Sequence, residues 1–503
     1  MTPYRYPIRQ VEQYIVYQRI LEHSTPMLGE AMILLVNPNL MKPPVTPVAL
    51  DYLGQTLEQA GFQTGLLDLS FEQDPSSAIR GALSGDEHLV AVTVRNIDDC
   101  YYTSQDFCLD RTREIISEIR EYTSAPIVVG GVGYSIFPKE ALDFLKADAG
   151  VIGEGEEVLC NLAAGLTDGK DLTAQPGLLL RGARIVDVLP AEPPNLAEMD
   201  LSHRSVVDNA RYFREGAMAG FETKRGCNQK CIYCPEPGSK GSIIRVRDPE
   251  NVAQELENLL NQGVDTFHTC DSEFNLPPDH AIEVCNAIVR RGLGDRIRWY
   301  AYAVPHPFPE ELAVAMRRAG CVGIDFGADH AHEGMLARLG RRHREEHLWE
   351  TAERCRRHGM VTMYDLLLGG PGETRESIAY TVDIVKSVAV DRVGVAFGAR
   401  IYPRTALGNL VNREGFHSDN PSLHGSVNGN TGFLRPVYYV SASLGDDIGP
   451  FLHDLIGEDD RFLFGGTEPS DHNYNYNDNS VLAEAIRSGA RGAFWDILRR
   501  VSS

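Results

Sequence analysis

Three cysteines carry the clearest chemistry in this sequence. Cys227, Cys231 and Cys234 have the spacing C-x3-C-x2-C and follow an apolar, strand-like segment. A cubane iron–sulfur cluster usually takes four cysteines, so three thiolates on one loop would leave its fourth iron open. The alternative is a structural zinc site, which needs four protein ligands, but no fourth Cys or His stands at ligand spacing. The spacing therefore predicts a 4Fe-4S cluster with one open iron, and hence an enzyme.

Composition narrows the class of partner. The chain has 70 acidic and 48 basic residues and a net charge of -22, which disfavours binding to nucleic acid. The best basic candidate is the run Arg-Arg-His-Arg that begins at Arg341, and we interpret it as a solvated helix face. The sequence therefore favours a small-molecule substrate.

Cysteine usage and hydropathy indicate the compartment. Seven further cysteines are scattered and fit small buried hydrophobic residues in a reducing environment. The N-terminus lacks the apolar core of a signal peptide. No apolar run reaches the roughly 18 residues of a membrane span. We expect a cytoplasmic protein without membrane contact.

The chain length of 503 residues suggests roughly three domains. Short apolar runs near residues 32–37, 64–69, 88–94, 126–130 and 149–153 alternate with helical segments, which predicts a doubly wound, Rossmann-like α/β sheet. Six further strands, near 219–223, 266–269, 298–303, 322–326, 362–368 and 393–401, predict a partial (β/α)6 barrel. The expected divisions are a helical extension (1–30), the first domain (31–165), a connector (166–215), the barrel (216–410) and a small C-terminal domain (411–503).

The carboxyl ends of the first domain's strands should hold a ligand, as in other open α/β sheets. Glycines there would let the backbone approach a bulky group. A plain dinucleotide site is the alternative, but no G-x-G-x-x-G opens a helix after the first strand. The candidates for cofactor binding are Asn37, Arg95, Asn96, Gly130, Gly131, Gly133, Tyr134, Ser135, Gly153, Glu154, Gly155 and Glu156.

Residues 215–410 resemble the radical S-adenosylmethionine (SAM) superfamily. The cysteine spacing matches, and Tyr233 fills the aromatic position before the last cysteine. Gly370 and Pro371 resemble the glycine–proline loop beside SAM, and Arg400 lies in a late-barrel segment typical of members with a preceding cobalamin domain. The resemblance implies that SAM chelates the open iron.

Residues 31–165 resemble the cobalamin-binding domain of cobalamin-dependent radical SAM enzymes. The D-x-H-x-x-G motif is absent, so the resemblance implies cobalamin without a protein histidine on cobalt. Leu69, after the second strand, could face the lower side of cobalt. The alternative is an ordinary core leucine.

Glu273 lies just past a barrel strand, at the rim where such barrels place their chemistry. It could contact SAM or ligate the open iron. The second role is implied by a resemblance to the tryptophan 2-C-methyltransferases of thiopeptide biosynthesis, in which SAM serves as a plain methyl donor. Tyr438 and Tyr439 are candidates near the barrel mouth, and His306 and Asp365 could also face the pocket or be structural.

The resemblance implies a cobalamin- and SAM-dependent C-methyltransferase of antibiotic biosynthesis. Methylcobalamin would pass a methyl group to carbon 2 of the indole of L-tryptophan, and an electron donor would reduce cobalamin. The base is left open among a Tyr, a carboxylate and SAM itself. The alternatives are radical methylation of an sp3 carbon and cobalamin-dependent cyclisation. A methylthiolating RNA enzyme would need a second cysteine cluster, and a non-enzymatic cobalamin sensor is the remaining alternative.

Overall fold

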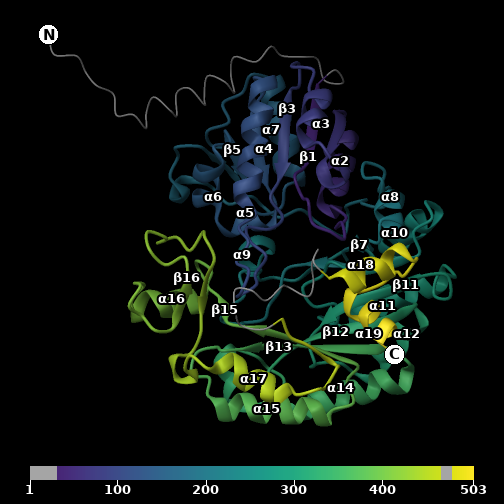
Figure 1. Ribbon diagram of the computed structural model, residues 1–503. Helices are drawn as coiled ribbons and strands as arrows, with labels where there is room; N and C mark the ends of the chain where they lie inside the picture. Colours follow the sequence, from purple (N-terminus) through teal and green to yellow (C-terminus); the bar gives the residue numbers. More distant parts are fainter. Residues whose placement is uncertain (1–30, 466–478, 503) are drawn as a thin grey trace.

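The structure is a computed structural model that describes residues 31–465 and 479–502. Figure 1 shows a first α/β domain, in purple and blue, lying above a larger one in teal and green. The expected helical extension of residues 1–30 lies outside the described residues.

The first domain is a six-stranded sheet with the order β2-β1-β3-β4-β5-β6. Its first five strands are parallel, as expected. Along β1, Leu34 and Val36 pack on one face and Ile33 and Leu35 on the other, so the strand is buried on both sides. The parallel strands are β1 (Met32–Asn37), β2 (Gln63–Asp68), β3 (Leu89–Thr93), β4 (Ile127–Gly130) and β5 (Ala149–Val151).

Helices cover both faces of this sheet, which confirms the doubly wound fold. Leu50 of α2 and Leu159 of α7 share one core. Ile79 of α3, Ile116 of α4 and Leu142 of α6 share the other. The helices are α2 (Val48–Gln59), α3 (Pro75–Ala82), α4 (Leu109–Tyr122), α5 (Val132–Ile136), α6 (Pro138–Leu145) and α7 (Glu156–Thr167).

Residues 166–215, expected as a connector, contain regular elements. β6 (Leu178–Leu180) pairs antiparallel with β5 and closes one edge of the first sheet. α8 (Asn209–Arg214) follows further along. A three-residue strand is too short to show a period in the sequence, so the sheet edge was not predicted.

The second domain is an open barrel of parallel strands in the order β18-β14-β13-β12-β11-β10-β7. The six predicted βα strands are all present, which confirms the partial (β/α)6 barrel, and the short β18 (Phe462–Leu463) extends its edge. The six strands are β7 (Ala219–Phe221), β10 (Thr266–Thr269), β11 (Arg298–Ala303), β12 (Cys321–Asp329), β13 (Val361–Leu368) and β14 (Arg392–Phe397). The helices are α10 (Pro249–Asn261), α11 (Pro278–Arg290), α12 (Glu310–Arg318), α13 (Glu333–Leu339), α14 (Glu345–His358) and α15 (Arg375–Ser387).

The alternation of side chains along β12 decides which residues enter the barrel. Ile324, Phe326 and Ala328 belong to the core between the strands and the helices. Because successive side chains of a strand point to opposite faces, Asp325 points into the barrel interior. The ladder is irregular between Gly327 and Asp329, so the rule does not extend to Asp329. By the same rule the packing of Tyr364 and Leu366 in that core turns Asp365 of β13 inward.

The described part of residues 411–503 is divided among three places. β16 (Leu423–Gly425) and β17 (Val437–Tyr439) form a small antiparallel sheet with β15 (Ala399–Arg400), and α16 (Ala406–Glu414) lies beside it. This sheet shares a core with the first domain. α17 (Ile448–Ile456) packs on the barrel's helical layer, and α18 (Ser480–Arg487) packs against α19.

α19 (Phe494–Ser502) covers the end of the barrel at which the strands begin. Trp495 is 1% exposed, and its ring lies 5.8 Å from that of Tyr300 on β11. The Tyr300 hydroxyl donates a hydrogen bond of 2.7 Å to Asp496. A Cβ at Gly323 of β12 would lie 2.9 Å from Trp495, so the helix sits tightly against the strands.

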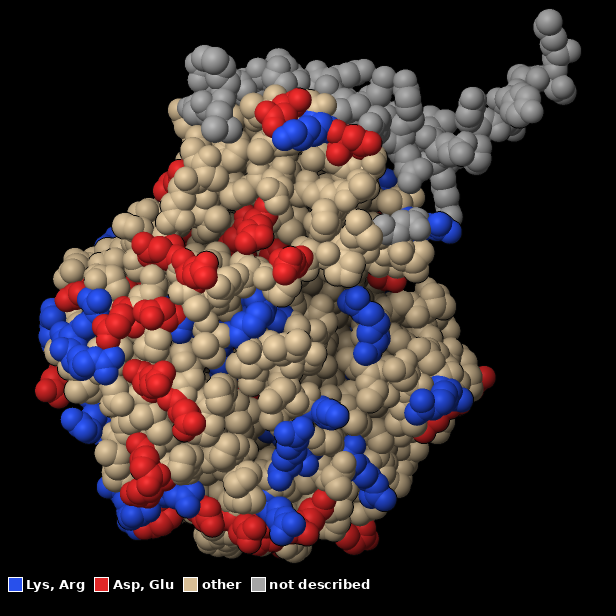
Figure 2. All heavy atoms as spheres, turned by 180° about the vertical axis from the view of Figure 1, so that it is seen from behind, with Lys and Arg blue, Asp and Glu red and all other residues tan. Residues whose placement is uncertain are grey.

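The surface and the helices give two further observations. On the face drawn in Figure 2, acidic and basic side chains of the described residues are intermixed. No helix between residues 31–465 or 479–502 is long and apolar enough to cross a membrane.

A buried ion cluster joins the two domains. Arg204 is completely buried and contacts Asp51 of α2 at 2.7 Å and Glu255 of α10 at 2.5 Å. Arg247 approaches Glu255 at 2.6 Å, and the Tyr52 hydroxyl donates to the same carboxylate at 2.8 Å. Each charge is compensated only while the others stay in place.

Arg204→Met should therefore lower the free energy of unfolding by about 3–5 kcal/mol, because it leaves the buried Asp51 without its cation and Glu255 with Arg247 alone. Urea unfolding followed by circular dichroism measures this. The control is Arg290→Met, which breaks an exposed pair with Glu250 of 2.5 Å and should cost less than about 1 kcal/mol. Equal losses for the two variants would contradict a structural role of the buried cluster.

Candidate active site

The three cysteines lie on a loop between two short elements of the barrel. The loop leaves β8 (Lys224–Arg225), which pairs with β9 (Arg245–Val246), and ends at α9 (Pro237–Lys240). Gly226 has φ +91°, and a Cβ there would lie 2.1 Å from the Ile243 carbonyl oxygen, so only glycine fits this turn. Cys227 is buried, and Cys231 and Cys234 are half-buried.

The thiols suit a cluster better than a single ion. Among the described residues, no group of three Cys, His, Asp or Glu side chains could hold one metal ion. A cubane distributes its ligands over separate irons, so its three thiolates need not meet at one point. Burial raises the pKa of all three thiols, that of Cys234 to about 12. Bound iron supplies the positive charge that favours the thiolate form.

Glu273 lies beside this loop. Burial raises its pKa to about 7, Arg341 and Lys224 lower it, and Asp329 raises it. Its negative charge raises the pKa of Cys227 and of Cys231, which places the carboxylate close to both thiols. The Glu273 side chain makes no hydrogen bond within the described part of the chain, so it is available to a ligand.

Arg341 is the main positively charged residue beside the cysteine loop. The prediction that it lies on a solvated helix face is wrong. It is not on a solvated helix face: it lies between α13 and α14 with its side chain 5% exposed. Its guanidinium donates to Cys231 Sγ at 3.1 Å, approaches Asp329 at 3.4 Å and donates to the Gly327 carbonyl. Tyr233 donates to the same Asp329 carboxylate, so the predicted aromatic residue is tied to this group.

The barrel interior next to Glu273 holds further polar residues. Tyr302 and Asp325 are direct partners on β11 and β12, and the Tyr302 ring lies 4.6 Å from that of His268. Burial and the charge of Asp329 raise the pKa of Asp365 to about 7. Burial, then Asp365, then Glu273 raise the pKa of Asp325 well above its usual range. Sequence analysis named Asp365 but missed Tyr302 and Asp325.

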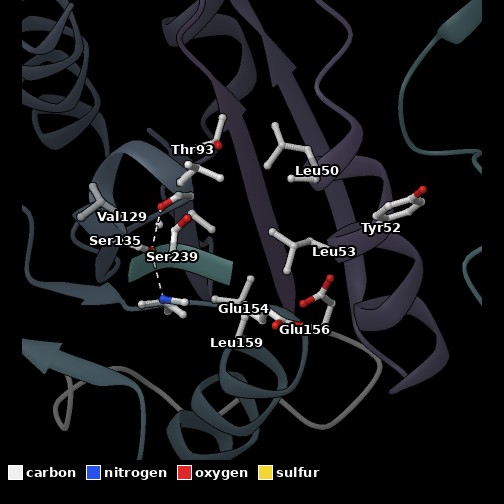
Figure 3. A pocket seen from close by; sticks show the side chains of 18 of the residues that line it. Leu50, Tyr52, Leu53, Thr93, Val129, Ser135, Glu154, Glu156, Leu159 and Ser239 are labelled. Carbon is white, nitrogen blue, oxygen red and sulfur yellow. Dashed lines mark hydrogen bonds between the residues drawn. The ribbon is translucent and has the colours of Figure 1, made fainter. Parts of the chain in front are cut away.

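The first domain has a cavity at the carboxyl ends of its strands (Figure 3). It leaves about 890 Å³ of space between protein atoms, part of it open to solvent. In Figure 3, Leu50 and Leu53 of α2 line one side and Thr93 and Ser135 the other. The predicted residues that line it are Gly130, Gly131, Ser135, Gly153, Glu154, Gly155 and Glu156. None of the lining residues is a histidine.

The glycines of this edge are required by close packing. A Cβ at Gly131, where φ is +107°, would lie 2.8 Å from the Val94 carbonyl oxygen, and one at Gly133 would lie 3.0 Å from it. Ser135 donates to the Gly131 carbonyl at 2.9 Å and accepts from the Gly153 amide at 2.9 Å. A mainly apolar cavity with a glycine-lined mouth fits a large ligand such as cobalamin.

Glu154 and Glu156 face a cation that the sequence analysis did not single out. Arg225 donates to Glu154 at 2.9 Å, to Glu156 at 2.6 Å and to Glu222 at 2.9 Å. Arg225 lines the same cavity and precedes Cys227 by two residues. The two glutamates therefore connect the cavity to the cysteine loop.

Asn37 and Leu69 lie in packed surroundings. The Asn37 amide donates to Asp68, Ser70 and Tyr212, each at 3.0 Å. Leu69 is completely buried in the core of the first domain. This position agrees with the alternative of an ordinary core leucine.

Arg95 and Asn96 follow β3 and face the barrel. Arg95 is exposed and donates to Asn96 at 2.9 Å. Its charge lowers the pKa of Tyr302 of β11, which burial raises, so Arg95 acts electrostatically on a residue of the barrel. Tyr134, by contrast, is completely buried in the core of the first domain.

The late-barrel candidates are brought together by the small sheet. Arg400 pairs with Asp98 at 2.7 Å and so ties β15 to the loop after β3. Tyr438 is completely buried, and its ring lies 5.6 Å from that of Tyr102. Its hydroxyl finds no hydrogen-bond partner in the described residues. Tyr439, the next residue of β17, packs instead into the core of the first domain.

The remaining predicted residues lie at loops of the barrel. Gly370 is buried and Pro371 half-buried, and a Cβ at Gly370 would lie 3.0 Å from Leu339 of α13. His306 is exposed, with its ring 4.1 Å from that of His347.

Comparisons with known protein families agree with this geometry. The B12 binding domain family matches residues 41–163, and the Radical SAM superfamily matches residues 221–385. The "Tryptophan 2-C-methyltransferase" of Streptomyces laurentii is 32% identical over 93% of this chain and 96% of its own length. An uncharacterised methyltransferase of Pyrococcus horikoshii is 27% identical over 56% of this chain and 62% of its length.

Solved structures give the same result. The radical SAM methyltransferase TsrM from Kitasatospora setae, with tryptophan substrate and a SAM analogue bound, is 32% identical. It matches with a TM-score of 0.86 over 94% of this chain and 98% of its own. The same enzyme with cobalamin and a [4Fe-4S] cluster gives a TM-score of 0.85. The cobalamin-dependent enzyme OxsB, 16% identical with a TM-score of 0.67 over 82% of this chain and 64% of its own, shares the fold. This chain belongs to the cobalamin-dependent radical SAM methyltransferases, in the family of tryptophan 2-C-methyltransferase.

Proposed function

We propose that this protein transfers a methyl group from SAM to carbon 2 of the indole ring of L-tryptophan. The observation that carries the proposal is the similarity to tryptophan 2-C-methyltransferase over nearly the whole of both chains. When bound, cobalamin supplies the methyl carrier between SAM and the substrate. An external electron donor keeps cobalamin in its reduced form.

The cysteine loop would hold the 4Fe-4S cluster through Cys227, Cys231 and Cys234. Arg341, which contacts Cys231 and Asp329, would supply positive charge beside the cluster. Glu273 is the free acceptor next to the loop and serves as a ligand of the open iron or as a contact to SAM. Because the Glu273 carboxylate makes no other hydrogen bond within the described residues, ligation of the open iron is the favoured role.

The first domain would hold cobalamin at the glycine-lined ends of β3, β4 and β5. The apolar cavity between these strands and α2 takes part of it. The charge of Arg95 in the first domain acts on Tyr302 of the barrel, which supports a reaction site where the first domain faces the barrel interior. The substrate would be bound there, away from bulk water.

Replacing Glu273 tests its role at the cluster. We expect Glu273→Ala to change the EPR signal of the reduced cluster even without SAM, because a ligand beside the open iron is removed. The control is Glu236→Gln, since Glu236 lies nearby but is already paired with Lys240 at 3.3 Å. A signal that changes only after SAM is added would instead assign Glu273 to SAM binding.

Filling the cavity of the first domain should prevent cobalamin binding. At Gly130 the nearest atom to an added Cβ is 3.7 Å away, and the residue follows Val128 on the face of α2 and α7. Gly130→Leu is therefore expected to fold and to lower cobalamin affinity at least about tenfold, the factor given by 1.4 kcal/mol. Absorbance of the reconstituted protein measures this. Gly81→Leu, on open helix surface, is the control, and equal retention by both variants would contradict the assignment.

Anaerobic turnover tests the reaction itself. With labelled SAM, L-tryptophan and an electron donor, mass spectrometry should detect 2-methyltryptophan without an equivalent amount of 5′-deoxyadenosine. One 5′-deoxyadenosine per methylated product would favour the radical alternative at an sp3 carbon. Absence of any methylated tryptophan would contradict the substrate.

A further inference from the structure

Asp325 has a buried oxygen without a hydrogen-bond partner in the barrel interior. The side chain points inward from β12, and the residue is 4% exposed. Its Oδ1 accepts no hydrogen bond from any described residue. Buried polar atoms almost always find a partner, so such an atom in an active-site barrel indicates a group supplied by a ligand.

The neighbouring Asp365 decides the state of Asp325. The carboxyl groups of Asp325 and Asp365 share a hydrogen bond. Two neighbouring carboxylates cannot both be stable as anions away from water. Burial and the charge of Asp365 raise the pKa of Asp325 well above its usual range. Burial and the charge of Asp329 raise the pKa of Asp365, whereas its hydrogen bond with Asp325 lowers it. Because Oδ1 has no partner, the hydrogen bond with Asp365 uses Oδ2 of Asp325, which leaves Oδ1 as an acceptor.

The surroundings of Asp325 are acidic and aromatic. The charges that act on it come from Asp365 and Glu273, which are both acidic. Its neighbour in register is Tyr302, whose ring packs against His268. An acceptor placed between acidic groups and an aromatic ring suits an aromatic ligand that carries an N–H group.

We propose that Asp325 Oδ1 accepts a hydrogen bond from an N–H group of the substrate and thereby positions the ring in the barrel interior. The inference rests on the proposed function, because it takes tryptophan as the substrate. Tryptophan offers two N–H sources, the indole nitrogen and the α-ammonium group. Asp325 acts here as a neutral acceptor and not as the base.

Two variants test the acceptor in the enzyme loaded with cluster and cobalamin. Asp325→Asn keeps an acceptor and a donor toward Asp365, and its dissociation constant for L-tryptophan should stay within about threefold of wild type. Asp325→Leu keeps the size but loses the acceptor, and should weaken tryptophan binding about ten- to a hundredfold. Titration calorimetry measures both. Met363→Leu, at the register partner of Asp325, controls for repacking of the interior.

Two analogues identify the donor without any variant. 1-Methyl-L-tryptophan lacks the indole N–H, and indole-3-propionate lacks the ammonium group. The wild type should bind one of them at least about tenfold more weakly than L-tryptophan, and Asp325→Leu should bind that analogue and tryptophan about equally.

Several results would overturn the inference. These are equal binding of all three ligands by the wild type, unchanged tryptophan affinity in Asp325→Leu, or a loss in Asp325→Asn as large as in Asp325→Leu. A loss of SAM affinity alone would also overturn it, because the oxygen would then serve SAM. Failure of the wild type to bind tryptophan at all contradicts the proposed function instead, and the two failures are thus distinguishable.

Discussion

The ion cluster around Arg225 sets the relative position of the two domains. Its guanidinium contacts Glu154 and Glu156 of the first domain and Glu222 of the barrel, with a side-chain exposure of 7%. A buried cation is tolerated only while its partners surround it, so the domains cannot shift far without exposing an uncompensated charge. Because Cys227 follows two residues later, the same group fixes the cysteine loop relative to the cavity of the first domain.

The barrel interior and its rim contain several acidic side chains. Four carboxyls, those of Glu273, Asp325, Asp329 and Asp365, interact electrostatically in this region. Arg341 contacts Asp329 at 3.4 Å, and Lys224 also acts on Glu273. Gathering like charges in a buried space is unfavourable, and it raises the pKa values of Glu273, Asp325 and Asp365. A cationic ligand relieves that repulsion, and the sulfonium of SAM is such a cation. The acidic surroundings therefore favour a ligand with the positive charge of the methyl donor.

Much of the fold and part of the site could be predicted from sequence, for physical reasons. Both sheets consist of short apolar runs between helices, a local pattern, and the cysteine spacing is also local. Arg341 and Asp325 were missed because their importance comes from contacts with residues distant in sequence, Cys231 for the first and Asp365 for the second. A basic run was taken for a solvated surface, since nothing in its own sequence shows that the cysteine loop folds over it.

The position of α19 has a consequence for the order of events in catalysis. Trp495 and Asp496 close the end at which the barrel strands begin. Within the described residues, α19 thus blocks one end of the barrel and leaves the end that faces the first domain. Molecules that share a single opening must leave in the reverse order of their entry whenever the later one covers the earlier. For molecules that enter through that end, the position of α19 therefore fixes the order of exchange. The ligand bound deepest is the first to enter and the last to leave.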